Sequence, residues 1–310
     1  MSSLISLTNI VKKYRTMCAL NGVSLEIKPG ITGLLGPNGA GKSSLIKLIL
    51  GLVKITSGTG TILGHQLGRE GRQIRDKIGY MPEDDCYIPG LSGVEVVQFS
   101  ACLAGLPQIE ALRRAHEILD FCGMKQERYR TIETYSTGMR QKTKFAAAIV
   151  HDPEFLIFDE PTSGLDPEER ESLLDRIKFL SVQANKSVLI STHILPDVQA
   201  ICDDVLILSS GKVVLSDSLA NLNRTTSPTI SFRVAGDHDP ILQKLRAGGL
   251  TVSFSFDRRV IVEGAGESLS DQVWRAAHET GTTIQSLTPA KNSLEEIFLT
   301  TIRESVHAIA

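Results

Sequence analysis

The chain has 310 residues, of which 42% are hydrophobic and 22% are charged, and its formal net charge at pH 7 is −2. This length suits one large domain and a small one, or two domains of medium size, and the composition is ordinary for a soluble globular protein. A net charge near zero gives no electrostatic reason to expect a nucleic-acid partner. The best apolar run, Leu45–Ile55, is broken by Lys47 and Lys54 and falls short of the roughly 18 residues that span a bilayer. The first residues carry no signal-peptide pattern, and the five cysteines include no C-x-x-C pair, which argues against a cysteine metal cluster.

The first part of the chain predicts strands followed by a strand–loop–helix unit. Leu4–Val11 and Val23–Ile27 are rich in branched apolar residues, as strands are. Ile31–Leu35 is a short apolar run that ends in a glycine-rich loop, and Ser44–Leu52 has helical character. Lys77–Met81 predicts a further strand. A glycine-rich loop between a strand and a helix is the context that a phosphate-binding loop requires.

The middle of the chain changes character twice. Residues 84–145 contain helix-spaced apolar positions at Val94–Ala104 and Ile109–Cys122, which predict a helical subdomain inserted into the fold. Strand and helix patterns then alternate through Phe155–Phe158, Pro167–Ala184, Ser187–Ser191, Pro196–Cys202 and Val205–Leu208. This alternation predicts an α/β fold with a mostly parallel sheet covered by helices.

The last third of the chain predicts a separate small domain. A polar stretch near Asn221–Pro228 is interpreted as a linker. After it come strand, helix, strand, strand, helix and strand patterns at Thr229–Val234, Pro240–Ala247, Thr251–Phe256, Arg259–Gly264, Leu269–Thr280 and Thr283–Leu287, and a final helix at Leu294–Ile302. The βαββαβ order is that of a small α+β ferredoxin-like domain. We therefore expect a nucleotide-binding domain at residues 1–222 and a small C-terminal domain at residues 226–310.

Residues 36–43 read Gly-Pro-Asn-Gly-Ala-Gly-Lys-Ser and fit the pattern G-x-x-x-x-G-K-[ST] in full. The glycines allow successive backbone N–H groups to turn inward around phosphate oxygens. Lys42 can reach the β- and γ-phosphates, and the Ser43 hydroxyl can ligate Mg²⁺. The helix that follows adds the partial positive charge of its N-terminus. The sequence thus predicts an ATP site made by Gly36, Pro37, Asn38, Gly39, Ala40, Gly41, Lys42, Ser43 and Ser44.

Two adjacent acids follow a strand with a buried type of sequence, Phe155–Phe158. They are Asp159 and Glu160, and they stand at the carboxyl end of that strand, where open α/β sheets bind ligands. We expect Asp159 to hold Mg²⁺, directly or through water, and Glu160 to orient and deprotonate the attacking water. The Asn-Lys pair at residues 185–186 is followed by Ser-Val and not by x-Asp, so the guanine-reading motif of a GTPase is missing.

Three further segments resemble ATP-binding cassette (ABC) proteins, a P-loop NTPase family with a helical subdomain. Residues 135–141 read Tyr-Ser-Thr-Gly-Met-Arg-Gln and resemble the family's signature segment, residues 163–166 read Ser-Gly-Leu-Asp and resemble its D-loop, and His193 matches its switch histidine. The resemblance implies that two cassettes face each other head to tail. Each ATP then lies between one phosphate loop and the Ser136 and Gly138 of the opposite cassette.

The resemblance also assigns roles to single residues. It implies that His193 contacts the γ-phosphate, that Asp166 of the D-loop belongs to the nucleotide site and that Tyr14 stacks on adenine. The chain departs from the family pattern at Glu83, which stands where the family has its Q-loop glutamine. A glutamate can ligate a metal or accept from a metal-bound water, but when ionised it cannot donate a hydrogen bond. We therefore expect Glu83 to join Ser43 and Asp159 at the metal.

The signature segment also differs from the family pattern, because residues 135, 137 and 139 are Tyr, Thr and Met. Together with Met-Pro-Glu at 81–83 and Asn-Ser-Leu-Glu-Glu-Ile-Phe-Leu at 292–299, these departures resemble cassettes that serve exporters with a separate six-helix permease. That resemblance implies a homodimeric ATPase that uses ATP and Mg²⁺, works with a membrane permease and lies on the cytoplasmic face of the membrane.

Two other functions fit the sequence less well. A soluble ABC protein acting on ribosomes or DNA usually has two cassettes or long coiled coils, whereas this chain has one phosphate loop and no sustained heptads. A regulatory module that binds ATP without hydrolysis is disfavoured by the presence of Lys42, Asp159, Glu160 and His193. No residue pattern identifies a transported substrate.

Overall fold

The computed structural model describes residues 3–85, 87–222, 229–254, 259–264, 268–289 and 294–307. They form two compact units. The larger unit comprises Met1–Leu219 and Phe298–Ala310, and the smaller comprises Ala220–Ile297. No helix in the described part of the chain is both long enough and apolar enough to cross a membrane.

The larger unit is built on a six-stranded sheet with the strand order β10-β9-β3-β8-β7-β6. Its strands are β3 (Ile31–Leu35), β6 (Ile78–Met81), β7 (Phe155–Asp159), β8 (Ser187–Ser191), β9 (Asp204–Ser209) and β10 (Lys212–Ser218). All neighbours pair in parallel except β9 and β10. Every residue of β3, β7 and β8 is buried, which explains their mostly apolar sequences. The mostly parallel sheet expected from the sequence is confirmed.

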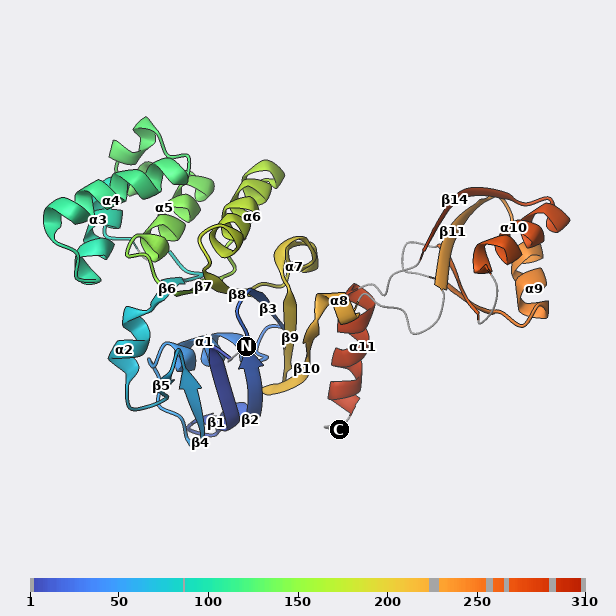
Figure 1. The fold of residues 1–310 in the computed structure, drawn as a ribbon, viewed down its shortest axis with the longest axis horizontal. Coiled ribbons are helices and arrows are strands. Elements are labelled where there is room, and N and C mark those ends of the chain that lie inside the picture. Colours follow the sequence, from blue (N-terminus) through green and yellow to red (C-terminus); the bar gives the residue numbers. More distant parts are fainter. Residues whose placement is uncertain are drawn as a thin grey trace. The chain divides into compact units, whose positions relative to one another are not determined.

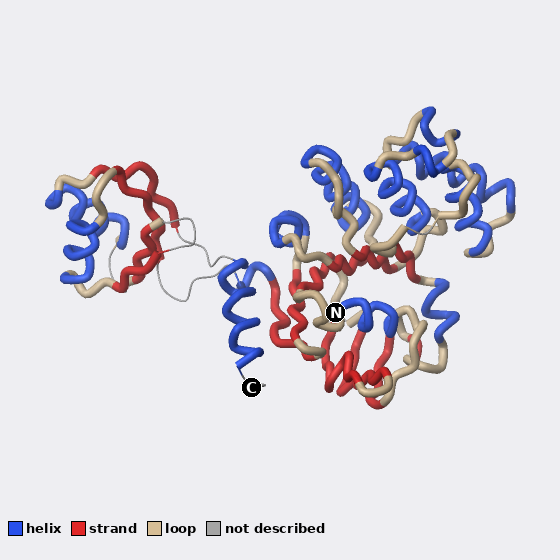
Figure 2. Tube along the Cα trace, turned by 180° about the vertical axis from the view of Figure 1, so that it is seen from behind, coloured by secondary structure: helices blue, strands red, loops and turns tan. Residues whose placement is uncertain are grey.

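A second, antiparallel sheet with the order β2-β1-β4-β5 faces the first. Its strands are β1 (Ile5–Tyr14), β2 (Met17–Ile27), β4 (Ser57–Ile62) and β5 (His65–Gln66). Helix α1 (Lys42–Ile49) lies between the two sheets (Figures 1 and 2), and its buried side chains join one core with residues of β1, β2, β7 and β8. The sequence did not predict β4, because its first four residues, Ser-Gly-Thr-Gly, lack the branched apolar side chains typical of strands.

Helices cover the opposite face of the six-stranded sheet, with α3, α4 and α5 drawn in green in Figure 1. Besides α1, the helices that lie entirely within this unit are α2 (Gly71–Asp76), α3 (Gly93–Leu103), α4 (Gln108–Phe121), α5 (Thr137–Ile149), α6 (Pro167–Val182) and α7 (Leu195–Ile201), with short 3₁₀ turns at Gln126–Tyr129 and Ile132–Thr134. Ser92 and Glu95 form a capping box that starts α3. The helices predicted at Val94–Ala104 and Ile109–Cys122 agree with α3 and α4 to within one residue.

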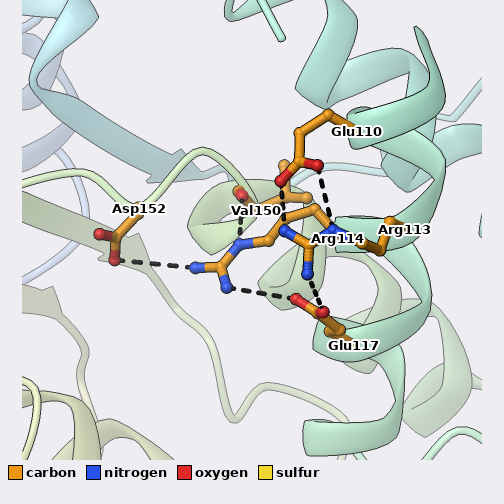
Figure 3. Close-up of polar contacts among 6 residues, drawn as sticks. All are labelled: Glu110, Arg113, Arg114, Glu117, Val150 and Asp152. Atoms are coloured by element: carbon orange, nitrogen blue, oxygen red, sulfur yellow. Dashed lines mark hydrogen bonds and ion pairs between the residues drawn. The ribbon is translucent and has the colours of Figure 1, made fainter. Parts of the chain in front are cut away.

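Arg114 of α4 ties the helical subdomain to the loop that follows α5 (Figure 3). Its Nε donates to the carbonyl of Val150 at 3.3 Å, and its terminal nitrogens lie 3.5 Å from Glu117 and 3.8 Å from Asp152. Among the described residues, the neighbouring Arg113 pairs with Glu110 and Glu117, which are acids of its own helix. Because these ion pairs are exposed to water, they contribute little to the stability of the fold.

The smaller unit has a four-stranded antiparallel sheet with the order β12-β13-β11-β14. Its elements are β11 (Thr229–Ala235), α9 (Asp239–Ala247), β12 (Thr251–Phe254), β13 (Val260–Glu263), α10 (Leu269–Thr280) and β14 (Thr283–Pro289). Phe232 and Val260 are fully buried in its own core. This is the ferredoxin-like arrangement expected from the sequence. The end of the predicted strand Thr251–Phe256 and most of the predicted linker lie outside the described residues. Helix α8 (Leu219–Leu222) precedes β11 and helix α11 (Leu294–His307) follows β14, and the boundaries between the two units fall within these two helices.

Candidate nucleotide site

The candidate site lies where four parallel strands end. β6, β7, β8 and β3 are consecutive neighbours, so their carboxyl ends meet at one edge of the sheet. The segments that follow them bring thirteen of the predicted site residues into the lining of one pocket of about 740 Å³. These residues are Gly36, Pro37, Asn38, Gly39, Ala40, Gly41, Lys42, Ser43, Ser44, Glu83, Asp159, Glu160 and His193. Residues as far apart in the sequence as Gly36 and His193 therefore line one cavity.

The phosphate loop is shaped by glycine and by the start of α1. Gly41 has φ 108°, and a Cβ there would lie 2.6 Å from the carbonyl oxygen of Ala19, so no other residue fits without displacing the backbone. The Nζ of Lys42 donates to the carbonyl of Gly36 at 2.6 Å. The ammonium group, the loop N–H groups and the N-terminus of α1 thus gather positive potential at one point. This arrangement suits a polyphosphate.

Glu160 and His193 meet beside the phosphate loop. Nδ1 of His193 lies 2.9 Å from Oε2 of Glu160, and the backbone N–H of Glu160 donates to the carbonyl of Ser191 at 2.8 Å. Glu160 is buried, with 6% of its surface exposed, and has φ 48°, a left-handed conformation that is uncommon for a glutamate. Such a conformation persists only where the surroundings hold it, and it is often found at active sites. The His193 side chain is 65% exposed and stays accessible to a ligand.

The acidic residues of the pocket affect one another. Burial raises the pKa of Asp159, and the nearby carboxylates of Glu83 and Glu160 raise it further, while Lys42 opposes them. A divalent cation would offset this concentration of negative charge. The Ser43 hydroxyl and the carboxylates of Asp159 and Glu83 all line the pocket, and oxygen is the ligand atom that Mg²⁺ prefers. In the described part of the chain no three His, Cys, Asp or Glu side chains are placed to hold a metal by themselves, so phosphate and water oxygens would have to complete the ligand set.

Lys144 of α5 holds the segment that carries Glu83. Its Nζ donates to the carbonyls of Glu83 at 2.8 Å and of Pro82 at 3.1 Å, and lies 3.8 Å from the carboxylate of Asp85. No sequence pattern pointed to Lys144, because its partners are backbone carbonyls about 60 residues away in the chain. The segment after β6 is thereby fastened to the helix that begins with the signature segment.

The signature segment forms the start of α5. Ser136 is the N-cap, and its Oγ accepts from the backbone N–H of Met139 at 3.2 Å. Gly138 is buried in the first turn, and a Cβ at that position would overlap the carboxylate of Glu169 from α6. The carboxylate is the end of a flexible side chain, so a side chain at position 138 would displace Glu169 but not the backbone of α6. This contact is independent of any contact with phosphate.

The tyrosine at position 135, a departure from the family pattern, is accommodated by a second glycine. Tyr135 is 4% exposed, its hydroxyl donates to the carbonyl of Glu127 at 2.8 Å, and a Cβ on Gly93 would overlap that hydroxyl. Burial raises the pKa of the Tyr135 hydroxyl, which therefore stays protonated and able to donate. The departure is thus a local change of packing.

Four predicted site residues do not line the pocket: Tyr14, Ser136, Gly138 and Asp166. Tyr14 ends β1 with the Nζ of Lys12 4.5 Å from its ring centroid, and Asp166 caps α6 by accepting from the N–H of Glu169 at 2.8 Å. The pocket gathers the residues predicted for phosphate, metal and attacking water. It does not gather those that the family resemblance assigns to adenine or to a second cassette.

Comparison with known proteins supplies the context for this pocket. Residues 20–163 match the ABC transporter family. The chain is 36% identical to the linearmycin resistance ATP-binding protein LnrL of Bacillus subtilis over 77% of this chain and 78% of that protein. It is 31% identical to the daunorubicin/doxorubicin resistance ATP-binding protein DrrA of Streptomyces peucetius over 95% of this chain and 91% of that protein. The dimeric post-hydrolysis structure of the ATP-binding cassette MJ0796, bound to ADP and Pi, superposes with a TM-score of 0.65 at 26% identity and covers 69% of this chain and 98% of that chain.

Proposed function

Since the chain belongs to the ATP-binding, ATP-hydrolysing subunits of ABC transporters, we propose that its hydrolytic site is the pocket bounded by Lys42, Glu160 and His193. Lys42 and the loop N–H groups bind the β- and γ-phosphates. With Nδ1 of His193 on Glu160, the opposite nitrogen, Nε2, is the one available to the γ-phosphate. Glu160 accepts a proton from the attacking water while the water oxygen forms a bond to the γ-phosphorus. The bond between the γ-phosphorus and the bridging oxygen breaks, and this oxygen leaves with ADP.

Three side chains that line the pocket offer oxygen atoms to a metal ion. Ser43 and Asp159 hold Mg²⁺, with Glu83 as a further oxygen donor, directly or through water. When bound, the ion neutralises charge on the phosphate oxygens. The three donors come from α1, β7 and the segment after β6, so their mutual positions depend on the strand order of the sheet.

The observation that carries the assignment is the 2.9 Å contact between Glu160 and His193 at the edge occupied by the phosphate loop. Glu160→Gln should keep ATP binding but lower kcat by about 100-fold or more, because the amide cannot accept the proton. Phosphate release and ATP binding are measured in parallel, with Glu168→Gln, an exposed acid of α6, as the control. Retained turnover in Glu160→Gln, or an equal loss in Glu168→Gln, would contradict the assignment.

We further propose that two copies of this chain close around two ATP molecules. Ser136 and Asp166 are exposed at the starts of α5 and α6 and lie outside the pocket of their own chain. Ser136 and Gly138 would then meet the γ-phosphate held by the other copy, with Asp166 beside them and Tyr14 against adenine. Glu160→Gln with ATP should therefore elute as a dimer in size-exclusion chromatography, whereas the same variant without ATP should not.

For the transporter as a whole, we propose export driven through a separate membrane permease. The names of two relatives refer to resistance to linearmycin and to daunorubicin or doxorubicin, and expelling a compound is one way to resist it. The cassette would dock from the cytoplasmic face through its helical subdomain, beside the Glu83 segment held by Lys144. Affinity purification of the full chain from solubilised membranes should recover a multi-helix membrane protein, and its repeated absence would count against this proposal.

A further inference from the structure

A buried carboxylate outside the pocket joins three segments of the site. Asp197, in the first turn of α7, has no exposed surface. Its Oδ2 accepts from Oγ1 of Thr162 at 2.5 Å, and its Oδ1 accepts from Nε of Arg170 at 2.5 Å. Thr162 is itself 2% exposed. Hydrogen bonds of this kind are strengthened by charge and by the low dielectric of the interior, and leaving one partner buried alone is costly.

Each partner in this cluster lies close in sequence to a residue of the proposed site. Thr162 follows Glu160 by two residues, Arg170 follows Asp166 by four, and Asp197 follows His193 by four. The three segments are the turn after β7, the start of α6 and the start of α7. One carboxylate therefore fixes the relative positions of the proposed base, the D-loop helix and the helix after the switch histidine.

The strained backbone of Glu160 explains why hydrogen bonds such as those of Asp197 are needed around it. With φ 48° the glutamate keeps its conformation only if both sides of its backbone are held. On its N-terminal side, the N–H of Glu160 donates to the carbonyl of Ser191 at 2.8 Å. On its C-terminal side, the carbonyl of Glu160 accepts from the N–H of Ser163 at 3.2 Å. The hydroxyl of Thr162, within that same turn, is held by Asp197.

We propose that Asp197 is a positioning residue for ATP hydrolysis. It acts through Thr162 and Arg170 to keep the Glu160–His193 pair and the D-loop in a single arrangement, and it does not touch the nucleotide. This inference rests on the proposed site. Loss of the Asp197 hydrogen bonds should lower turnover while leaving ATP affinity nearly intact, because the phosphate loop takes part in neither of these two contacts.

Thr162 offers a matched pair of variants. Thr162→Val keeps the side-chain shape but removes the hydroxyl donor, and Thr162→Ser keeps the donor but removes the methyl group. We expect kcat to fall about 10-fold in Thr162→Val with KM for ATP within about 2-fold, and most of kcat to be retained in Thr162→Ser. Equal kcat values in the two variants, or a rise in KM that accounts for the whole loss in Thr162→Val, would overturn the proposal.

A second comparison separates positioning from general stability. Arg128, 7% exposed, pairs with Asp120 and donates to the carbonyls of Lys125 and His116 within the helical subdomain, away from the pocket. Asp197→Asn and Arg128→Gln should both lower Tm, but only Asp197→Asn should lower kcat, assayed below both transitions. If both variants lose activity in proportion to stability, Asp197 is merely structural. An inactive wild-type chain would instead refute the proposed site itself.

Discussion

At the scale of single residues, Glu83 is where the pocket differs most in charge from the family pattern. It is exposed but lines the pocket. Burial of Asp159 raises the pKa of that residue, and the negative charge of Glu83 raises it further. If Glu83 is a metal donor, Glu83→Gln should raise the Mg²⁺ concentration for half-maximal ATPase activity by about 3-fold or more, since an amide oxygen is a weaker ligand for a hard cation. Asp84→Asn, an exposed neighbour outside the pocket, is the control. An unchanged Mg²⁺ dependence in Glu83→Gln would remove the metal role.

At the scale of elements, α5 connects the signature segment to the segment after β6, which contains Glu83. Lys144 makes this connection through backbone carbonyls, and its side chain is 9% exposed. Lys144→Met should lower the unfolding free energy by about 1–2 kcal/mol, since carbonyls lose a charged donor, and should speed amide exchange over residues 83–85. Lys142→Met, which removes a partly exposed pair with Glu169 at 3.4 Å, should have less effect on both. Unchanged exchange in Lys144→Met would show that other contacts hold the segment.

At the scale of the whole molecule, the two units have separate hydrophobic cores. Phe232 is fully buried in the core of the smaller unit, so Phe232→Ala should cost about 3–5 kcal/mol there, enough to unfold a domain of this size. Calorimetry should show one transition lowered or lost while ATP binding by the larger unit persists. Phe145→Leu, in the core of the larger unit, should move the other transition. A single transition that shifts as a whole in both variants would contradict two independent cores.

The sequence by itself determined the features that depend on neighbours along the chain. The glycine-rich loop with Lys42 and Ser43, the apolar strand ending at Asp159 and Glu160, and the α/β alternation are all local, because φ freedom, strand burial and helix starts are set within a few residues. The same holds for the βαββαβ order of the smaller unit. Where local signals are weak, as in the glycine-rich β4, the sequence predicted no strand.

Only the tertiary structure decided which of these local features meet. The strand order places β3 beside β8 and β8 beside β7, and this brings His193 against Glu160 and both against the phosphate loop. It also sets Lys144 on the carbonyls after β6, Tyr135 against Gly93 and Asp197 between Thr162 and Arg170. The hydrogen bonds among these contacts join residues 27 to 62 positions apart in the chain, across packed elements. Their energies come from burial and geometry, which a residue pattern does not encode.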